Sequence, residues 1–418
     1  MIPPEFQQPL GDGPRIFISA GDHSGDLHGA LLIQAIKKQN PSVRIEGFGG
    51  EAMIAAGLHC HYNMLDLGVM FFLEVLLRLP TLGKIYDQVY RYFEKSPPDL
   101  LIFIDYPGFN LFLSKKARQC KIPTHYYIVP QLWAWAPWRI HRVRARIDRM
   151  SVLFAFEEKW YKNRGMTQVQ TAGHPLYDHL AEKKLNPEIL KAIENYAQGQ
   201  WVVLLAPGSR TREIQRNFSL MLRAGKRLQK KNPQVVFVVP CAKKKLYPLL
   251  KKKLQEEQFQ ALLLPGYSHE AMSTARICLA TSGTVTIELL YYKIPTVVLY
   301  RIGWLANKLL RFTRFLQCRW ITLVNILAQE EVFPERLDSD IPTAWIEEKM
   351  ASLLREGGHR EKCLEKISHL HQTQIQRGAS TRAASQILEH LSEIIAHQPS
   401  NDSLAFEKSD AIQASLSI

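Results

Sequence analysis

The fold of this chain is decided by the segment Asp99-Leu100-Leu101-Ile102-Phe103-Ile104-Asp105-Tyr106-Pro107-Gly108-Phe109-Asn110, where five apolar residues lead to a carboxylate at a Pro/Gly turn. Such an apolar run is typical of a strand buried on both faces of a parallel sheet, and ligands of these sheets collect at the carboxyl ends of strands. Asp105 is therefore predicted to face a ligand cleft, where a partly desolvated carboxylate can act as a general base near neutral pH. On this segment alone, a turn or helix-capping aspartate is the more common explanation.

Short apolar runs and amphipathic segments alternate from Arg15 onward. The predicted elements of the first half are strands over residues 16–20, 100–105 and 125–129 and helices over 27–38 and 111–120. This alternation predicts a doubly wound α/β domain.

A second series of strands follows the turn Gly173-His174-Pro175. Its predicted members are residues 201–206, 235–240, 261–264, 277–280 and 295–300. The simplest architecture is two Rossmann-like domains that face each other across a cleft and join near residue 176. The predicted boundaries are a flexible leader (1–14), an N-terminal domain (15–176), a C-terminal domain (177–365), helices returning to the first domain (366–397) and a disordered tail (398–418).

The composition narrows the class of protein. The 418 residues are 46% hydrophobic and carry a formal net charge of +14, which predicts two well-packed domains and anionic partners. The scattered cysteines favour a reducing compartment, and the isolated His59-Cys60-His61 cluster is weak support for a metal site, so none is predicted. The N-terminus has no signal-peptide pattern, and no apolar stretch is long enough to span a bilayer, so we expect a cytoplasmic protein.

A glycine-containing turn follows the first predicted strand. Within Ser19-Ala20-Gly21-Asp22-His23-Ser24-Gly25-Asp26, the two glycines would let a substrate approach the start of a helix. An ordinary capped turn is an equally good interpretation. A dinucleotide-binding Gly-x-Gly-x-x-Gly motif is absent here, and the turn 47–50 after the second strand carries little information alone.

Two turns of the second half are suited to anions. In Pro207-Gly208-Ser209-Arg210, a helix N-terminus with unbonded N–H groups beside a guanidinium would bind a diphosphate. The second turn, with Ser282, Gly283 and Thr284, places Glu288 about one helical turn later, where it could accept hydrogen bonds from ribose hydroxyls. Either turn alone is more often a helix cap, but together they favour a nucleotide-diphosphate ligand.

Two surfaces point to a membrane. Residues 67–82 are too apolar for a solvated helix and too short to span, so they predict either an interfacial membrane segment or a buried helix. The predicted membrane-facing side chains are Val69, Phe72, Leu73, Leu76, Leu77 and the adjoining Arg78. Further along, Trp133, Trp135 and Trp138 precede a predicted one-sided stripe formed by Arg139, Arg142, Arg146 and Arg149, and a similar basic stretch covers 304–320. Phospholipid headgroups suit both stretches, nucleic acid is a rival, and a solvated charged face is the simplest alternative.

These segments together resemble the lipid-A-disaccharide synthase family, inverting glycosyltransferases of GT-B architecture, from about Arg15 to about Leu391. The matching blocks lie at residues 20–26, 69–76, 104–110, 133–135, 173–175, 207–210, 282–288 and 323–327. The resemblance implies condensation of UDP-2,3-diacylglucosamine with 2,3-diacylglucosamine 1-phosphate (lipid X) into a β-1,6 disaccharide with release of UDP. It also implies a peripheral location on the cytoplasmic face of the inner membrane, and it implies neither a cofactor nor a metal.

The resemblance implies roles for single residues. Asp105 would be the general base, and the donor UDP would contact Gly208, Ser209, Arg210, Ser282, Gly283, Thr284, Glu288 and Asn325. The acceptor or the cleft would contact Gly21, Ser24, Gly25, Asp26, Met70, Glu74 and Asn110. The chain departs from the family pattern at Asp22, His23, Gly108, Val129 and Gln131, which bears on acceptor details and not on the transfer reaction.

Two other functions compete with this prediction. A soluble UDP-sugar epimerase of the same fold would need no lipid acceptor, and a non-catalytic binding protein would suit the net charge but not the two anion turns. We expect no nucleic-acid partner. The oligomeric state stays open, with a homodimer as one alternative.

Overall fold

The computed structural model describes the backbone of residues 5–67, 72–303 and 319–397. The chain divides into two compact units. Unit 1 comprises Met1–Leu132, Ala136–Asp178 and the chain from Arg377 onward, and unit 2 comprises Trp133–Trp135 and His179–Gln376. Each unit contains its own parallel sheet.

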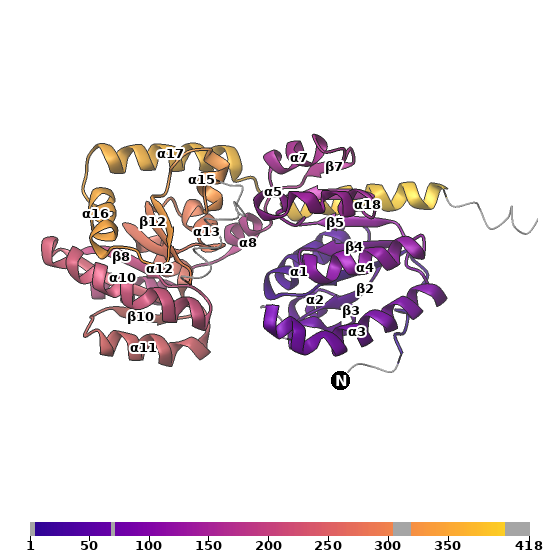
Figure 1. Cartoon of the computed structure of the whole chain (residues 1–418), viewed down its shortest axis with the longest axis horizontal. Coiled ribbons are helices and arrows are strands. Elements are labelled where there is room, and N and C mark those ends of the chain that lie inside the picture. Colours follow the sequence, from indigo (N-terminus) through magenta and orange to yellow (C-terminus); the bar gives the residue numbers. More distant parts are fainter. Residues whose placement is uncertain (1–4, 68–71, 304–318, 398–418) are drawn as a thin grey trace, which may run out of the picture. The chain divides into compact units, whose positions relative to one another are not determined.

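The sheet of unit 1 has seven strands in the order β3-β2-β1-β4-β5-β6-β7 (Figure 1). The strands are β1 (Arg15–Ala20), β2 (Arg44–Gly49), β3 (His59–Asn63), β4 (Leu100–Ile104), β5 (Thr124–Tyr127), β6 (Arg149–Val152) and β7 (Val169–Thr171). The main helices are α1 (His23–Gln39), α2 (Glu51–Ala55), α3 (Phe72–Lys95), α4 (Pro107–Gln119), α5 (Leu132–Trp135), α6 (Ile140–Arg144), α7 (Ala155–Lys162), α8 (Leu176–Glu182) and α18 (Ala379–His397), of which α5 and the end of α8 count with unit 2. Strands β1 and β4 pair in the centre of the sheet, with every residue of both buried.

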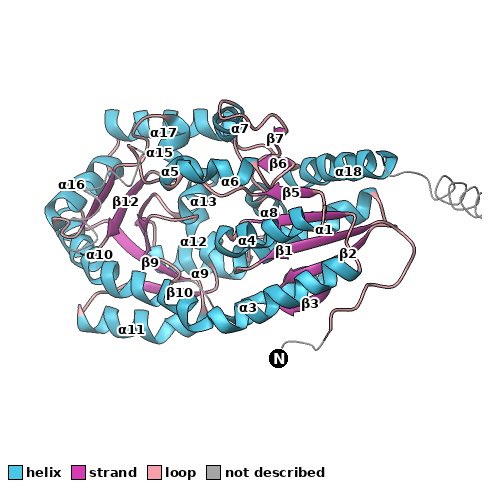
Figure 2. Cartoon of the chain, turned by 45° about the vertical axis from the view of Figure 1, so that its right-hand side comes forward, coloured by secondary structure: helices cyan, strands magenta, loops and turns pink. Residues whose placement is uncertain are grey.

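The sheet of unit 2 has six strands in the order β10-β9-β8-β11-β12-β13. Figure 2 labels β9, β10 and β12 among its magenta strands. The strands are β8 (Trp201–Ala206), β9 (Val235–Cys241), β10 (Leu262–Pro265), β11 (Ile277–Thr281), β12 (Thr296–Arg301) and β13 (Glu335–Asp338). The helices are α9 (Pro187–Ala197), α10 (Thr211–Lys231), α11 (Tyr247–Glu256), α12 (Ser268–Thr274), α13 (Val285–Tyr291), α15 (Leu323–Ala328), α16 (Thr343–Leu354) and α17 (Gly358–Gln374). Two Rossmann-like halves are therefore present, as the alternating pattern predicted.

The predicted strands appear in the structure with ends shifted by one or two residues. The sequence pattern did not indicate β3, β6, β7 or β13. These strands have only three to five residues each, β3 reads His-Cys-His-Tyr-Asn, and β13 reads Glu-Arg-Leu-Asp with every residue only half buried. An apolar run marks a strand only where both faces are covered, so these short strands gave no signal.

The returning part of the chain is shorter than predicted. Helix α17, which includes most of residues 366–376, belongs to unit 2, and the chain returns to unit 1 only from Arg377. There α18 packs along α1, and Asp178 accepts hydrogen bonds from the N–H groups of Gly378 (2.6 Å) and Ser380 (2.9 Å). The Asp178 carboxylate thus anchors the start of α18, a long-range contact that no local pattern reveals.

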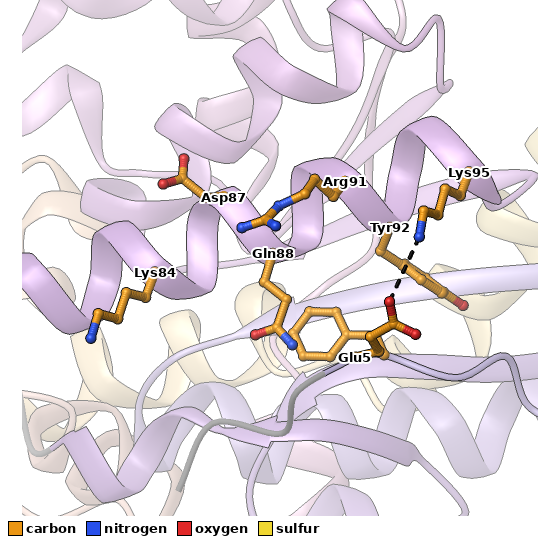
Figure 3. A pocket seen from close by; sticks show the side chains of 8 residues that line it. Glu5, Lys84, Asp87, Gln88, Arg91, Tyr92 and Lys95 are labelled. Atoms are coloured by element: carbon orange, nitrogen blue, oxygen red, sulfur yellow. Dashed lines mark ion pairs between the residues drawn. The ribbon is translucent and has the colours of Figure 1, made fainter.

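Residues 5–14 of the predicted leader make contacts with unit 1. The Phe6 ring is buried and stacks on His61 with ring centroids 4.7 Å apart, and Arg44 donates hydrogen bonds to the carbonyls of Gly13 (2.6 Å) and Pro9 (3.2 Å). Glu5 reaches α3, where it forms an exposed ion pair of 3.7 Å with Lys95 at the edge of a pocket (Figure 3). A Pro-rich segment with one aromatic residue looks disordered in sequence, but here that aromatic side chain enters the core.

Candidate active site

The backbone at Asp105 makes a sharp turn between β4 and α4. Asp105 and Tyr106 have φ angles of 43° and 47°, in the left-handed region that residues with a side chain rarely adopt. The turn is held from both sides: the Asp105 carbonyl accepts hydrogen bonds from the Tyr126 hydroxyl (2.7 Å) and the Asn110 amide (2.8 Å), while its N–H donates to the Ile128 carbonyl (3.2 Å). Strained backbone of this kind persists where surrounding contacts enforce it and is frequent at functional sites.

The carboxyl group of Asp105 is suited to proton transfer. Burial raises its pKa to about 7, the negative charge of Asp22 acts in the same direction, and a hydrogen bond from the Tyr106 backbone opposes them. A carboxylate with a pKa near neutrality combines basicity with a large deprotonated fraction at working pH. The environment therefore favours a general base over a simple turn aspartate.

The glycine-containing turn after β1 lies against the Asp105 turn. A Cβ atom on Gly21 would come within 2.2 Å of the Tyr106 ring, so only glycine leaves room for that ring. Asp22 caps α1 by accepting a hydrogen bond of 2.6 Å from the Gly25 N–H. The turn is thus a helix cap, which was one of the two interpretations, and it also lies next to the Asp105 turn, while its contact with a substrate stays a prediction.

A pair of histidines adjoins the same turn. The Ser24 hydroxyl lies 3.1 Å from Nε2 of His28, and the His28 and His174 rings are 5.9 Å apart. Burial, together with His28, lowers the pKa of His174 to about 3, so this ring stays neutral. The Gly173-His174-Pro175 segment, noted in sequence as a turn, therefore packs against α1; His28 was not predicted.

Two predicted acceptor residues, Asp26 and Asn110, form hydrogen bonds to other parts of unit 1. The Asp26 carboxylate is buried and accepts hydrogen bonds from the N–H groups of Gly50 (2.7 Å), Ala52 (3.1 Å) and Met53 (3.1 Å), which fixes the start of α2. The Asn110 side chain is fully buried, accepts a bond of 2.7 Å from the Ser19 hydroxyl and donates to the Asp105 carbonyl. Each side chain is thus engaged within unit 1, and the predicted acceptor role of both residues stays a prediction.

Unit 2 contains a pocket that gathers the two predicted anion turns. Strands β8 and β11 are neighbours, with Ala206 opposite Ala280, so the turns that follow them meet. The pocket encloses about 260 Å³ and is lined by seven of the eight predicted donor residues: Gly208, Ser209, Arg210, Ser282, Gly283, Thr284 and Glu288. Burial raises the pKa of the Glu288 carboxyl, and the charge of Lys183 opposes that shift.

The turn before α10 differs from the prediction in one respect. Its amides were expected to be unbonded, but the Ser209 N–H donates to Oε2 of Glu213 (3.1 Å), and Arg210 forms an ion pair with Oε1 (3.0 Å). Glu213, one turn into the helix, was not singled out in sequence. The Arg-x-x-Glu spacing, which is that of a capping interaction at a helix N-terminus, was the available signal.

Asn325, the eighth predicted donor residue, forms hydrogen bonds within its own segment of unit 2. Its side chain is fully buried, accepts hydrogen bonds from the N–H groups of Val332 (2.8 Å) and Phe333 (2.9 Å), and donates to the Phe333 carbonyl (2.8 Å). It does not line the pocket described above. These bonds order the loop between α15 and β13.

A family model described as lipid-A-disaccharide synthetase matches residues 16–391. The chain belongs to this family.

This chain aligns with other members of the family over almost the full length of each relative. The chain is 34% identical over 384 residues to a lipid-A-disaccharide synthase of Coxiella burnetii, which covers 90% of this chain and 98% of the relative. It is 36% identical over 373 residues to a lipid-A-disaccharide synthase of Pseudomonas putida, with 89% and 97% covered. Family membership confirms the predicted resemblance and the predicted enzyme class, a UDP-sugar glycosyltransferase of lipid A biosynthesis.

Solved structures share the fold of the family at low sequence identity. The Staphylococcus aureus MnaA–UDP co-structure has a TM-score of 0.62 at 14% identity, covering 93% of this chain and 99% of that one. A glycotransferase of kitacinnamycin has a TM-score of 0.59 at 14% identity, with 92% and 100% covered. These similarities confirm the predicted GT-B class of α/β fold.

The predicted membrane surface of this family member is only partly described. Val69 and Met70 lie outside the described residues, as do the side chains of Phe72, Leu73, Glu74, Leu76, Leu77 and Arg78 and most of 304–320; Arg319 and Trp320 are described. Among the described residues, no helix combines the length and apolar character needed to cross a membrane. Within those same ranges, His, Cys, Asp and Glu side chains form no group that could hold a metal ion.

The predicted arginine stripe is wrong. Arg139 ends a 3-10 turn, Arg142 lies in α6, Arg146 follows that helix and Arg149 begins β6, so the four do not share a helix face. Arg146 donates to the Leu111 carbonyl (2.8 Å), and Arg149 pairs with Glu393. The regular spacing persisted across a helix end, where periodicity no longer reports a face.

Proposed function

We propose that the chain transfers 2,3-diacylglucosamine from its UDP derivative to the 6-hydroxyl of 2,3-diacylglucosamine 1-phosphate. The Asp105 carboxylate takes the hydroxyl proton, the oxygen bonds to the anomeric carbon, and the bond from that carbon to the UDP oxygen breaks. A single displacement inverts the anomeric centre to give a β-1,6 linkage. The observation that carries this proposal is a strained, enforced turn that presents a carboxyl group with a pKa of about 7 at the end of β4.

The donor half of the reaction is assigned to the pocket of unit 2. Negative charge grows on UDP as it leaves, and the N-terminus of the 21-residue helix α10 with Arg210 can stabilise that charge. Glu288 is assigned to the ribose hydroxyls and the Ser282-Gly283-Thr284 turn to the phosphates. A UDP complex in a protein of the same fold supports this assignment. The reaction requires Asp105 and this pocket to meet during turnover.

The proposed acceptor substrate is a lipid. Both proposed substrates carry acyl chains, so the enzyme has to draw them from a bilayer, and we assign this contact to residues 67–82 with the +14 net charge favouring an anionic surface. The proposed location is the cytoplasmic face of the inner membrane. No cofactor or metal enters the proposed step.

The test uses the purified protein with both proposed substrates and no added metal, following UDP and the disaccharide. Asp105→Asn is compared with Asp12→Asn, an exposed carboxylate of unit 1. We expect turnover by the wild type and by the Asp12 variant, and its loss in the Asp105 variant. Formation of an epimerised UDP-sugar without acceptor would favour the epimerase alternative. Failure to bind either substrate would favour a non-catalytic binding protein.

A further inference from the structure

One carboxylate occupies the place assigned to the donor's diphosphate. Oε2 of Glu213 accepts the Ser209 N–H (3.1 Å) and Oε1 pairs with the Arg210 guanidinium (3.0 Å). These are the amide and the cation that would hold a phosphate. A carboxylate bound in this way satisfies the turn with an anion supplied by the protein itself.

The shape of the turn is fitted to this carboxylate. Gly208 has φ of +109°, and a Cβ atom there would lie 2.5 Å from Oε2 of Glu213. The absent side chain at Gly208 thus provides the space that the carboxylate fills. The Glu213 side chain is 17% exposed, whereas the Arg210 side chain is 48% exposed and open to a ligand.

A second cation lies in the same electrostatic environment. Lys243 follows β9, and burial lowers the pKa of its amine, as do the positive charges of Lys245 and Arg210, while Glu213 opposes the shift. Its neighbour Ala242 lines the pocket. Arg210 therefore pairs with the Glu213 carboxylate, and the charge of that carboxylate also acts on Lys243.

We propose that Glu213 is an internal counter-ion, which the donor's diphosphate displaces and whose repulsion then promotes the release of UDP. This inference rests on the proposed function. The UDP group of the donor is esterified at its terminal phosphate, whereas free UDP carries an additional ionisable oxygen and therefore more negative charge at neutral pH. A nearby carboxylate consequently repels the product more strongly than the substrate. The exchange involves no covalent step.

Titration of UDP into the substrate-free protein tests this role. The variant Glu213→Gln keeps the size of the side chain and an oxygen that can accept the Ser209 N–H, but it removes the negative charge. We expect this variant to bind UDP about tenfold more tightly than the wild type. The inhibition constant of UDP in the transfer assay should fall by a similar factor, with a smaller change in the donor KM. The matched control is Glu256→Gln on α11, which removes a surface charge paired with Lys253 and lies outside the pocket; its UDP affinity should equal that of the wild type.

A purely structural role for Glu213 predicts the opposite sign. If the carboxylate only holds Arg210 in position, Glu213→Gln will bind UDP more weakly than the wild type, and that result or an unchanged affinity would overturn the inference. The variant Glu213→Asp retains the charge, so its UDP affinity should stay within about threefold of the wild type. Thermal unfolding of each variant verifies that it is folded. A wild type that binds no UDP would refute the proposed donor site as well, whereas normal wild-type binding with an unresponsive Glu213→Gln would refute this inference alone.

Discussion

The two strand-to-helix turns at Asp105 and Arg210 place the same chemical group in opposite environments. In unit 1, burial and the charge of Asp22 raise the pKa of the Asp105 carboxyl to about 7. In unit 2, the Glu213 carboxylate is held by a cation and a backbone N–H group. The first arrangement favours a group that accepts protons, whereas the second engages the carboxylate in an ion pair and a hydrogen bond. The comparison shows that contacts around each turn, more than the turn motif itself, assign its chemistry.

The largest expected effect is the loss of kcat on substitution of Asp105, which distinguishes proton transfer from binding of the donor. Asp105→Asn should lower kcat by roughly 10²–10⁴-fold, because it removes the general base, while the Kd for UDP stays unchanged. Steady-state kinetics and calorimetric titration with UDP measure the two quantities. A large loss of UDP affinity in this variant would show that Asp105 supports the donor site and not proton transfer.

A change at Arg210 should produce the reverse pattern. Arg210→Gln removes a charge-assisted contact to the diphosphate, worth about 1.5–3 kcal/mol, so the Kd for UDP should rise roughly 10- to 100-fold. The exposed Arg355 provides the control variant Arg355→Gln. If Arg210→Gln binds UDP as the wild type does, the pocket of unit 2 does not hold the diphosphate through this residue.

The pH dependence of the reaction tests the environment of Asp105. Because the base has to be deprotonated, kcat/KM should rise with pH through about 7. Asp22→Asn removes the neighbouring negative charge and still caps α1, since asparagine is a good N-cap residue. We expect this variant to shift the rising limb to lower pH by about half a unit or more. An unshifted limb would mean that burial alone sets the pKa.

The sequence predicted the features that depend on local pattern and adjacency of strands. The buried strands β4, β8 and β11 were visible as apolar runs, and the pairing of β8 with β11 brings the two anion turns into one pocket. By contrast, the buried contacts of Asn110 and Asn325 link segments through hydrogen bonds to particular backbone groups. A polar residue after a strand looks the same in sequence whether it faces a ligand or a loop, so its role could not be assigned.

The partners of several charged side chains could not be predicted from the sequence either. Asp178 and Asp26 both anchor helix N-termini that lie elsewhere in the fold, and neither contact follows from residue spacing. The arginine stripe failed for a related reason: Arg149 begins a strand and pairs with Glu393 of the distant helix α18. Electrostatic partners depend on tertiary arrangement, which pattern alone does not supply.

The smallest expected effect is on the thermal stability of the protein. It follows from the free-energy cost of burying the ionised Asp105 carboxylate. The folded-state pKa of about 7 exceeds the usual 3.8, so the folded chain binds more protons than the unfolded chain between these values. Stability should therefore fall as pH rises from about 4 to 7 and carry the full penalty above about 7. Asp105→Asn removes the charge, so its Tm should exceed that of the wild type by a few degrees at pH 8 and by less at pH 5. Scanning calorimetry at both pH values measures this difference, with Asp12→Asn as the control. An equal Tm difference at the two pH values would show that the carboxylate is not desolvated, and the contrast with Glu213 would then reduce to the ion pair alone.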